Sequence, residues 1–141
     1  MVLYHGSSRL FDIIKRKQPI ASPVDRKEKG KKSKAIFLTP SLCFAMFFAC
    51  KPEKGGNMVS MTKKVVLFEK EIDKEGAVYI YVVDNSEIQK FDKKWNNPYE
   101  ISVYTDEIPV ISVEKHVAGE IFELFRVVYS PEEFRKLVGA L

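Results

Sequence analysis

The chain has few of the residues that build disulfide frameworks and metal centres. Only two cysteines, Cys43 and Cys50, and two histidines, His5 and His116, occur among its 141 residues. The cysteines form no C-x-x-C pair, and neither histidine lies at ligand spacing from a cysteine or from the other histidine. The sequence therefore predicts no metal site and two reduced thiols, which is typical of a cytoplasmic protein.

Long apolar runs and targeting signals are also lacking. The longest apolar run, residues 42–50, has nine residues, against about 20 for a membrane-spanning helix. The N-terminus has no basic region followed by an apolar stretch, so we expect no secretory signal and no membrane partner. The length and the 45% apolar content are typical of one domain over residues 1–141.

Common nucleotide-binding and nucleophile motifs are missing as well. Gly30-Lys31-Lys32-Ser33 resembles the end of a phosphate-binding loop, but Asp25 stands where the first glycine of that loop belongs. No G-x-S-x-G elbow occurs. Ser7 lies too close to His5 in the sequence to count as a catalytic pair by itself.

The net charge of +4 is concentrated in one segment. Residues 15–34 carry nine basic and two acidic side chains, a net +7, so the other 121 residues sum to −3. Pro19, Pro23 and Gly30 interrupt this segment, which predicts a mobile basic loop at about 15–34. Such a loop is either simply solvated or contacts an anionic partner, such as a dinucleotide phosphate or a nucleic acid.

Helical signals come early in the chain and strand signals come late. The expected elements are a strand at 2–4, a brief helix at 9–15, a strand at 35–38, a buried helix at 41–51 begun by Thr39-Pro40, strands at 65–71 and 77–83, a helical turn within 85–95, strands at 99–104, 110–113 and 121–128, and a closing helix from Pro131 capped by Ser130. This order predicts an α+β domain with a mostly antiparallel sheet.

Three separated pieces carry residues suited to chemistry: Tyr4-His5-Gly6-Ser7, Ile36-Phe37-Leu38 with the aromatic helix after it, and residues 97–104 around Glu100. A histidine can hydrogen-bond a sugar hydroxyl, and a glycine lets a flat amide reach the backbone. Aromatic rings offer a stacking face, and a single carboxylate can stabilise an oxocarbenium-like sugar cation. Together these residues suit recognition of an aromatic amide and a ribose.

The pieces resemble the ADP-ribosyltransferase fold in its histidine–tyrosine–glutamate branch, which includes poly-ADP-ribose polymerases, diphtheria-type toxins and small rifamycin-inactivating transferases. Members read His-Gly-Ser or His-Gly-Thr at the end of the first core strand, a short "iYF" strand before a helix, and the catalytic glutamate in a segment like "yNEYiVYd". Residues 79–83 also resemble the central "IYiVe" strand of the short members. The resemblance implies a split antiparallel β-sheet core with a few flanking helices.

The resemblance also implies a role for each residue at the NAD site. His5 would hold a ribose hydroxyl of NAD, Gly6 would read the nicotinamide carboxamide through its backbone, and Ser7 would add a hydroxyl contact. Phe37 stands where the motif tyrosine is expected, with the ring but without the hydroxyl, and Phe48 would supply a second stacking ring.

Glu100 and His5 are thus the expected catalytic residues of an NAD-dependent mono-ADP-ribosyltransferase. Glu100 would contact the nicotinamide-ribose 2′-hydroxyl, promote loss of nicotinamide and orient a protein, nucleic-acid or small-molecule acceptor. Phe47 is the alternative to Phe48, because the two side chains point in different directions on a helix.

Other members of the same fold supply the alternatives. They are an NAD glycohydrolase with water as acceptor, and a catalytically inactive binder of nucleotide or nucleic acid with Phe37 as a sign of decay. The RNA 2′-phosphotransferases share the fold but rely on several arginines, and this chain has five. A purely structural protein–protein module is the residual possibility.

Overall fold

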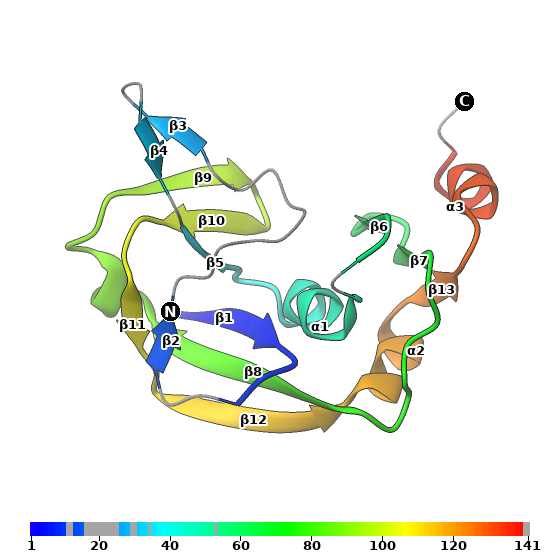
Figure 1. Ribbon diagram of the computed structural model, residues 1–141, viewed down its shortest axis with the longest axis horizontal. Helices are drawn as coiled ribbons and strands as arrows, with labels where there is room; N and C mark the ends of the chain where they lie inside the picture. The colour runs from blue at the N-terminus through cyan, green and yellow to red at the C-terminus, as the bar shows by residue number, and fades with distance from the viewer. Residues whose placement is uncertain (11–12, 16–25, 29–30, 34, 53, 140–141) are drawn as a thin grey trace.

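Two three-stranded antiparallel sheets form the centre of the computed structural model, which describes residues 1–10, 13–15, 26–28, 31–33, 35–52 and 54–139 (Figure 1). The first sheet contains, in spatial order, β1 (Val2–Ser7), β8 (Ala77–Asp84) and β12 (Ser112–Val117). The second contains β5 (Ile36–Leu38), β10 (Glu100–Val103) and β9 (Lys93–Asn97). The protein is therefore an α+β protein with mostly antiparallel strands, as the sequence predicted.

The two sheets meet edge to edge at β1 and β5, each of which is the outer strand of its own sheet. The Tyr4 N–H donates to the Thr39 carbonyl oxygen at 2.7 Å, and the Thr39 N–H donates to the Tyr4 carbonyl oxygen at 2.9 Å. Helix α1 (Leu42–Cys50) follows directly and packs on β1 (Figure 1). This bridge therefore fixes where the helix and both sheets come together.

Helix α1 begins later than the Thr39-Pro40 pattern suggested. The side chain of Ser41 caps it, with Oγ accepting a hydrogen bond from the Phe44 N–H at 3.2 Å. The backbone of Thr39 is engaged with Tyr4 instead, and its Oγ1 accepts from the Ser41 N–H at 3.0 Å. The hydroxyl that caps a helix is the one that reaches its free N–H groups, and here that is Ser41.

The other elements surround these sheets. They are β6 (Asn57–Ser60), β7 (Val65–Phe68) and β13 (Arg126–Val128) in a third sheet, the pair β2 (Ile13–Lys15) and β11 (Glu107–Pro109), the pair β3 (Arg26–Glu28) and β4 (Lys31–Ser33), short 3-10 helices at Asn85–Ile88 and Ala118–Glu120, and the helices α2 (Ile121–Leu124) and α3 (Pro131–Val138). Strand β13 runs parallel to β7, while the other described pairs are antiparallel. None of the helices in the described ranges combines the length and apolar character that crossing a membrane requires.

Several expected elements differ from the structure. The brief helix expected at 9–15 is wrong, because Ile13–Lys15 forms strand β2 and pairs with β11. The strand expected at 121–128 divides into α2 and β13. The strands expected at 65–71 and 77–83 exist, but they belong to different sheets. For Ile13–Lys15, long-range pairing outweighs a short local pattern.

The basic segment is only partly described. Its residues Arg26–Glu28 and Lys31–Ser33 are two paired antiparallel strands, β3 and β4, where a loop was expected. Residues 16–25, 29–30 and 34 of the predicted mobile loop lie outside the described residues.

The core has two main parts. Helix α1 packs with β7 and β8 in one hydrophobic cluster, and residues of β1, β5, β8 and β10 form another between the two central sheets. Both parts reach the junction of β1 and β5, so this junction is packed from two sides.

Candidate functional site

A pocket of about 60 Å³ opens where β1, β5, α1 and β10 meet. Its lining comes from these elements and the link between β5 and α1, namely Tyr4, His5, Gly6, Phe37, Leu38, Thr39, Phe44, Ala45, Phe48 and Glu100. The structure thus brings together five residues predicted from the sequence. The volume is far below the roughly 300–1,000 Å³ of pockets that enclose a drug-sized ligand, so only part of a dinucleotide could enter it.

His5 is oriented by the neighbouring sheet. Its Nδ1 lies 2.8 Å from the carbonyl oxygen of Phe37. Since a carbonyl only accepts, Nδ1 carries the proton, and in the neutral ring Nε2 is then the acceptor nitrogen. The ring also lies 6.0 Å from that of Tyr81, centroid to centroid. His5 therefore presents a defined tautomer at the pocket.

Gly6 directs backbone groups towards the pocket. The N–H and C=O of Tyr4 are bonded to Thr39, so they point away from β8. The direction of these groups alternates along an antiparallel strand, and Gly6 therefore turns its own N–H and C=O to the same edge as Tyr4. Its missing side chain has a structural reason too: a Cβ there would overlap the carbonyl oxygen of Ala45 in α1.

Phe37 reaches the pocket because of strand alternation. Its neighbours Ile36 and Leu38 are buried in the core between the sheets. Successive side chains of a strand point to opposite faces, so the Phe37 ring faces the pocket. Phenylalanine at this position gives the pocket an apolar wall without a hydroxyl.

Phe48, rather than Phe47, lines the pocket. The Phe47 ring stacks on Phe68 within the core, with centroids 5.9 Å apart. Phe44 also lines the pocket, and its ring meets that of Phe48 edge-on with centroids 5.0 Å apart. The Phe44 ring also stacks on the Tyr99 ring, with centroids 6.1 Å apart. Sequence reasoning missed Phe44, although its position four residues before Phe48 places both on one helix face.

Glu100 lies at the start of β10, and two unpredicted residues act on it. The Asn96 side chain donates from Nδ2 to Glu100 Oε1 at 2.9 Å. Lys51, which follows α1, places Nζ 5.0 Å from the centre of the Phe48 ring. Burial lowers the pKa of Lys51, and the negative charge of Glu100 opposes that shift. No sequence motif distinguished Asn96 or Lys51, because their proximity to Glu100 depends on tertiary structure.

Ser7 is the predicted site residue that the structure does not bring to the pocket lining. It lies at the end of β1 and is buried. Its Oγ accepts a hydrogen bond from the Arg9 N–H at 3.1 Å. The hydroxyl therefore stabilises the chain as it leaves β1.

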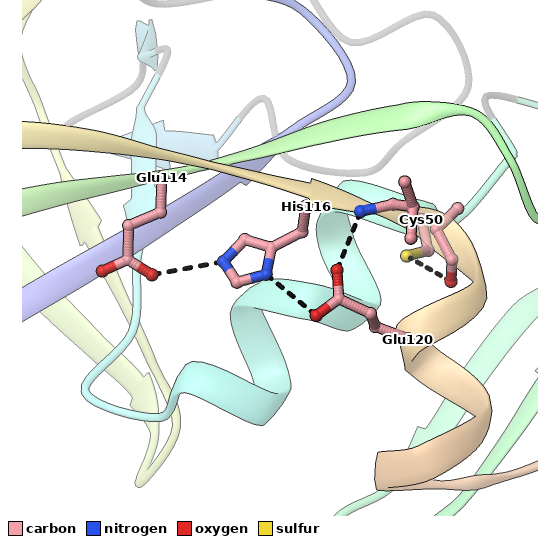
Figure 2. Close-up of polar contacts among 6 residues, drawn as sticks. Cys50, Glu114, His116 and Glu120 are labelled. Carbon is pink, nitrogen blue, oxygen red and sulfur yellow. Dashed lines mark hydrogen bonds and ion pairs between the residues drawn. The ribbon is translucent and has the colours of Figure 1, made fainter.

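A second polar cluster surrounds His116, whose imidazole lies between two carboxylates (Figure 2). Nε2 is 3.2 Å from Glu114 Oε1, and Nδ1 is 3.2 Å from Glu120 Oε1. Glu120 Oε2 accepts from the Val117 N–H at 2.8 Å. These contacts tie the end of β12 to the 3-10 helix after it.

The cysteines in the structure are both free thiols. Burial raises the pKa of Cys50 to about 12, with a further contribution from the charge of Glu120. The Cys50 thiol donates to the Ala118 carbonyl oxygen at 3.6 Å (Figure 2). Cys50 therefore stays a thiol, which is a much poorer nucleophile than a thiolate, and we assign it a packing role. Within the described ranges, no three His, Cys, Asp or Glu side chains are grouped to hold a metal ion.

The free energy of unfolding should fall as the pH rises through the pKa of His116. Burial lowers this pKa, but the hydrogen bonds and charges of Glu120 and Glu114 outweigh it and raise the pKa above its ordinary 6.5. The folded protein therefore binds the proton on His116 more tightly than the unfolded chain does. The resulting contribution of His116 to stability is complete at pH values below its pKa in the unfolded chain and is lost above its pKa in the folded protein.

Urea denaturation of the parent and of His116→Gln at several pH values measures this effect. The difference in the free energy of unfolding between the two proteins removes the contribution of His5. From about pH 6 upwards Glu114 and Glu120 stay ionised, so in that range the pH dependence of the difference reports His116. The difference should shrink towards alkaline pH, and a difference that does not change with pH would contradict the assignment.

Comparison with known proteins gives no relative on which to base a function. No protein-family model, curated protein or solved structure matches the chain. What the pocket can do is therefore inferred from its own residues.

Proposed function

We propose that the protein is an NAD-dependent mono-ADP-ribosyltransferase, which cleaves the nicotinamide–ribose bond and transfers ADP-ribose to an acceptor. The observation that carries the proposal is the convergence of His5, Gly6, Phe37, Phe48 and Glu100 on one pocket from four different elements. These are the residues to which the resemblance gave an NAD-binding or catalytic role.

The arrangement of the sheets supports the proposal. Two antiparallel sheets meet at the β1–β5 bridge between Tyr4 and Thr39, with few helices around them. The resemblance to ADP-ribosyltransferases implies a split antiparallel core, and the meeting of two antiparallel sheets at this bridge supports that part of the proposal. Glu100 and His5 lie in different sheets, so the junction between the sheets brings the two residues to one pocket.

The pocket offers suitable partners for a nicotinamide riboside group. The Gly6 N–H can donate to the carboxamide oxygen, and its C=O can accept from the carboxamide N–H. Phe37 and Phe48 provide apolar faces for the pyridine ring. His5 Nε2 can accept from a ribose hydroxyl. The nucleotide remainder of NAD would extend outside the pocket.

Glu100 supplies the negative charge that the reaction needs. When the C1′–N bond of NAD breaks, its electron pair leaves with nicotinamide and positive charge develops on the ribose. A fixed carboxylate stabilises that charge more in the transition state than in the ground state. The acceptor then forms a bond to C1′ and loses a proton, with Glu100 in place to orient it.

Calorimetry with two ligands tests the proposed binding mode. His5→Ala should weaken NAD binding about tenfold, because it removes one hydrogen bond to the ribose. Nicotinamide alone should bind the parent and His5→Ala equally, because His5 is assigned to the sugar. A parent that does not bind NAD, or an equal loss of both ligands, would contradict this arrangement.

A catalytically inactive NAD binder is the second candidate, because Phe37 provides a ring without a hydroxyl in the pocket wall. Such a protein would bind NAD without releasing nicotinamide.

If the protein does release nicotinamide, the product distinguishes two enzymes. Free ADP-ribose would indicate a glycohydrolase, and a labelled acceptor would indicate a transferase. The transferase proposal also includes a cytoplasmic location and an acceptor that is a protein, a nucleic acid or a small molecule.

A further inference from the structure

Strand β9 contains a bulge beside Glu100. Glu100 pairs with Asn97, but the next residue, Ile101, pairs with Trp95, so Asn96 is the extra residue on β9. A β-bulge redirects a side chain that regular pairing would place elsewhere, and bulges are frequent next to active sites. Here the bulged residue is the one whose side chain reaches the Glu100 carboxylate.

The chemistry of the contact fixes the orientation of the Asn96 amide. An ionised carboxylate only accepts hydrogen bonds, so the amide atom 2.9 Å from Glu100 Oε1 must be the nitrogen Nδ2. The same Nδ2 donates to Ser102 Oγ at 2.7 Å. One amide group therefore joins the carboxylate to a second polar side chain.

Ser102 is a firm anchor for Asn96. It is fully buried and lies on β10, the central strand of its sheet. Ser102 pairs with Phe37 of β5 on one side and with Lys94 of β9 on the other. The Asn96 Oδ1 atom, in contrast, is buried and meets no hydrogen-bond donor in the described part of the chain. Buried acceptors normally have a hydrogen-bond partner. Because Oδ1 meets no donor among the described residues, the two hydrogen bonds that Nδ2 donates set the orientation of the amide.

On the basis of the proposed transferase function, we infer that Asn96 is a positioning residue that holds the Glu100 carboxylate against the nicotinamide ribose. The chain of contacts from Ser102 through Asn96 to Glu100 selects one position of the carboxylate before substrate binds. Asn96 acts through Glu100 and has no contact of its own with NAD. Its loss should therefore change the rate of bond cleavage and leave NAD affinity unchanged.

Asn96→Ala should lower kcat for nicotinamide release about a hundredfold, because a misplaced catalytic group costs rate on this order. The dissociation constant for NAD, measured by calorimetry, should stay within threefold of the parent. Ser102→Ala should lower kcat by a smaller factor, about tenfold, because Asn96 remains but loses its anchor. The control is Gln89→Ala, an exposed side-chain amide outside the pocket lining whose Nε2 donates to the Asn85 carbonyl oxygen at 3.1 Å.

The outcomes separate this inference from the function on which it rests. A parent that releases no nicotinamide refutes the proposed function and the role of Asn96 with it. With an active parent, a kcat within threefold for Asn96→Ala overturns the positioning role and leaves Glu100 in place. Equal loss of kcat and NAD affinity, or an equal effect of Gln89→Ala, indicates a merely structural role. If Asn96→Ala does not fold, Ser102→Ala decides between these outcomes.

Discussion

Glu100→Gln should lower the rate of nicotinamide release from NAD by about a hundredfold or more, comparable to removing one preorganised electrostatic group. Glutamine keeps the size of the side chain and a hydrogen-bonding oxygen, so the change isolates the negative charge. The dissociation constant for NAD should change by no more than a few fold, because the charge is needed mainly when the ribose becomes cationic.

A matched carboxylate provides the control for this variant. Glu107 is exposed in β11 and lies outside the pocket lining, so Glu107→Gln should keep parental turnover. Near-normal turnover in Glu100→Gln, with NAD consumption verified in the parent, would remove Glu100 from the mechanism. Equal losses in both variants would mean that overall charge, rather than the pocket, controls the rate.

Gly6→Ala should destabilise the protein by about 3 kcal/mol, at the upper end of the usual cost of overpacking. The added methyl group would overlap the Ala45 carbonyl oxygen and lie 2.9 Å from the Ala49 nitrogen. Both atoms belong to the backbone of α1, so the whole helix would have to move away from β1. Urea denaturation measures the change in the free energy of unfolding.

Gly56→Ala is a matched control, since its Cβ would meet the exposed carboxylate end of Glu69. Neither Gly6 nor Gly56 has a positive φ, so backbone strain does not enter the comparison. The flexible Glu69 side chain can turn away, and the cost should stay within about 1 kcal/mol. Equal stability of Gly6→Ala and Gly56→Ala would show that α1 and β1 are not held at this distance.

The sequence was most informative where local chemistry determines structure. His5 and Gly6 follow one another on one strand, and the Ser130 cap with Pro131 marks the start of α3 as expected. Alternation in β5 similarly explains why Phe37 is turned away from its buried neighbours. At these positions a few adjacent residues determine the local structure.

The parts that were missed depend on contacts between distant segments. Phe47 and Phe48 are equivalent by local pattern, and only packing against Phe68 selects Phe47 for the core. Ser7 follows Gly6 in the motif, yet the turn after β1 uses its hydroxyl for the Arg9 N–H.

The bulge at Asn96 depends in the same way on how β9 pairs with β10. No pattern along the chain encodes that register. A one-residue change of register alters which side chains share a face, so the contact between Asn96 and Glu100 had to be seen in the structure.

Release of nicotinamide from NAD by the purified protein is the most direct test of the transferase proposal. We predict steady release by the parent protein, and release at least about a hundredfold slower by Glu100→Gln at the same NAD concentration. Absence of nicotinamide release by a folded parent protein, with any acceptor or with water alone, would contradict the transferase proposal.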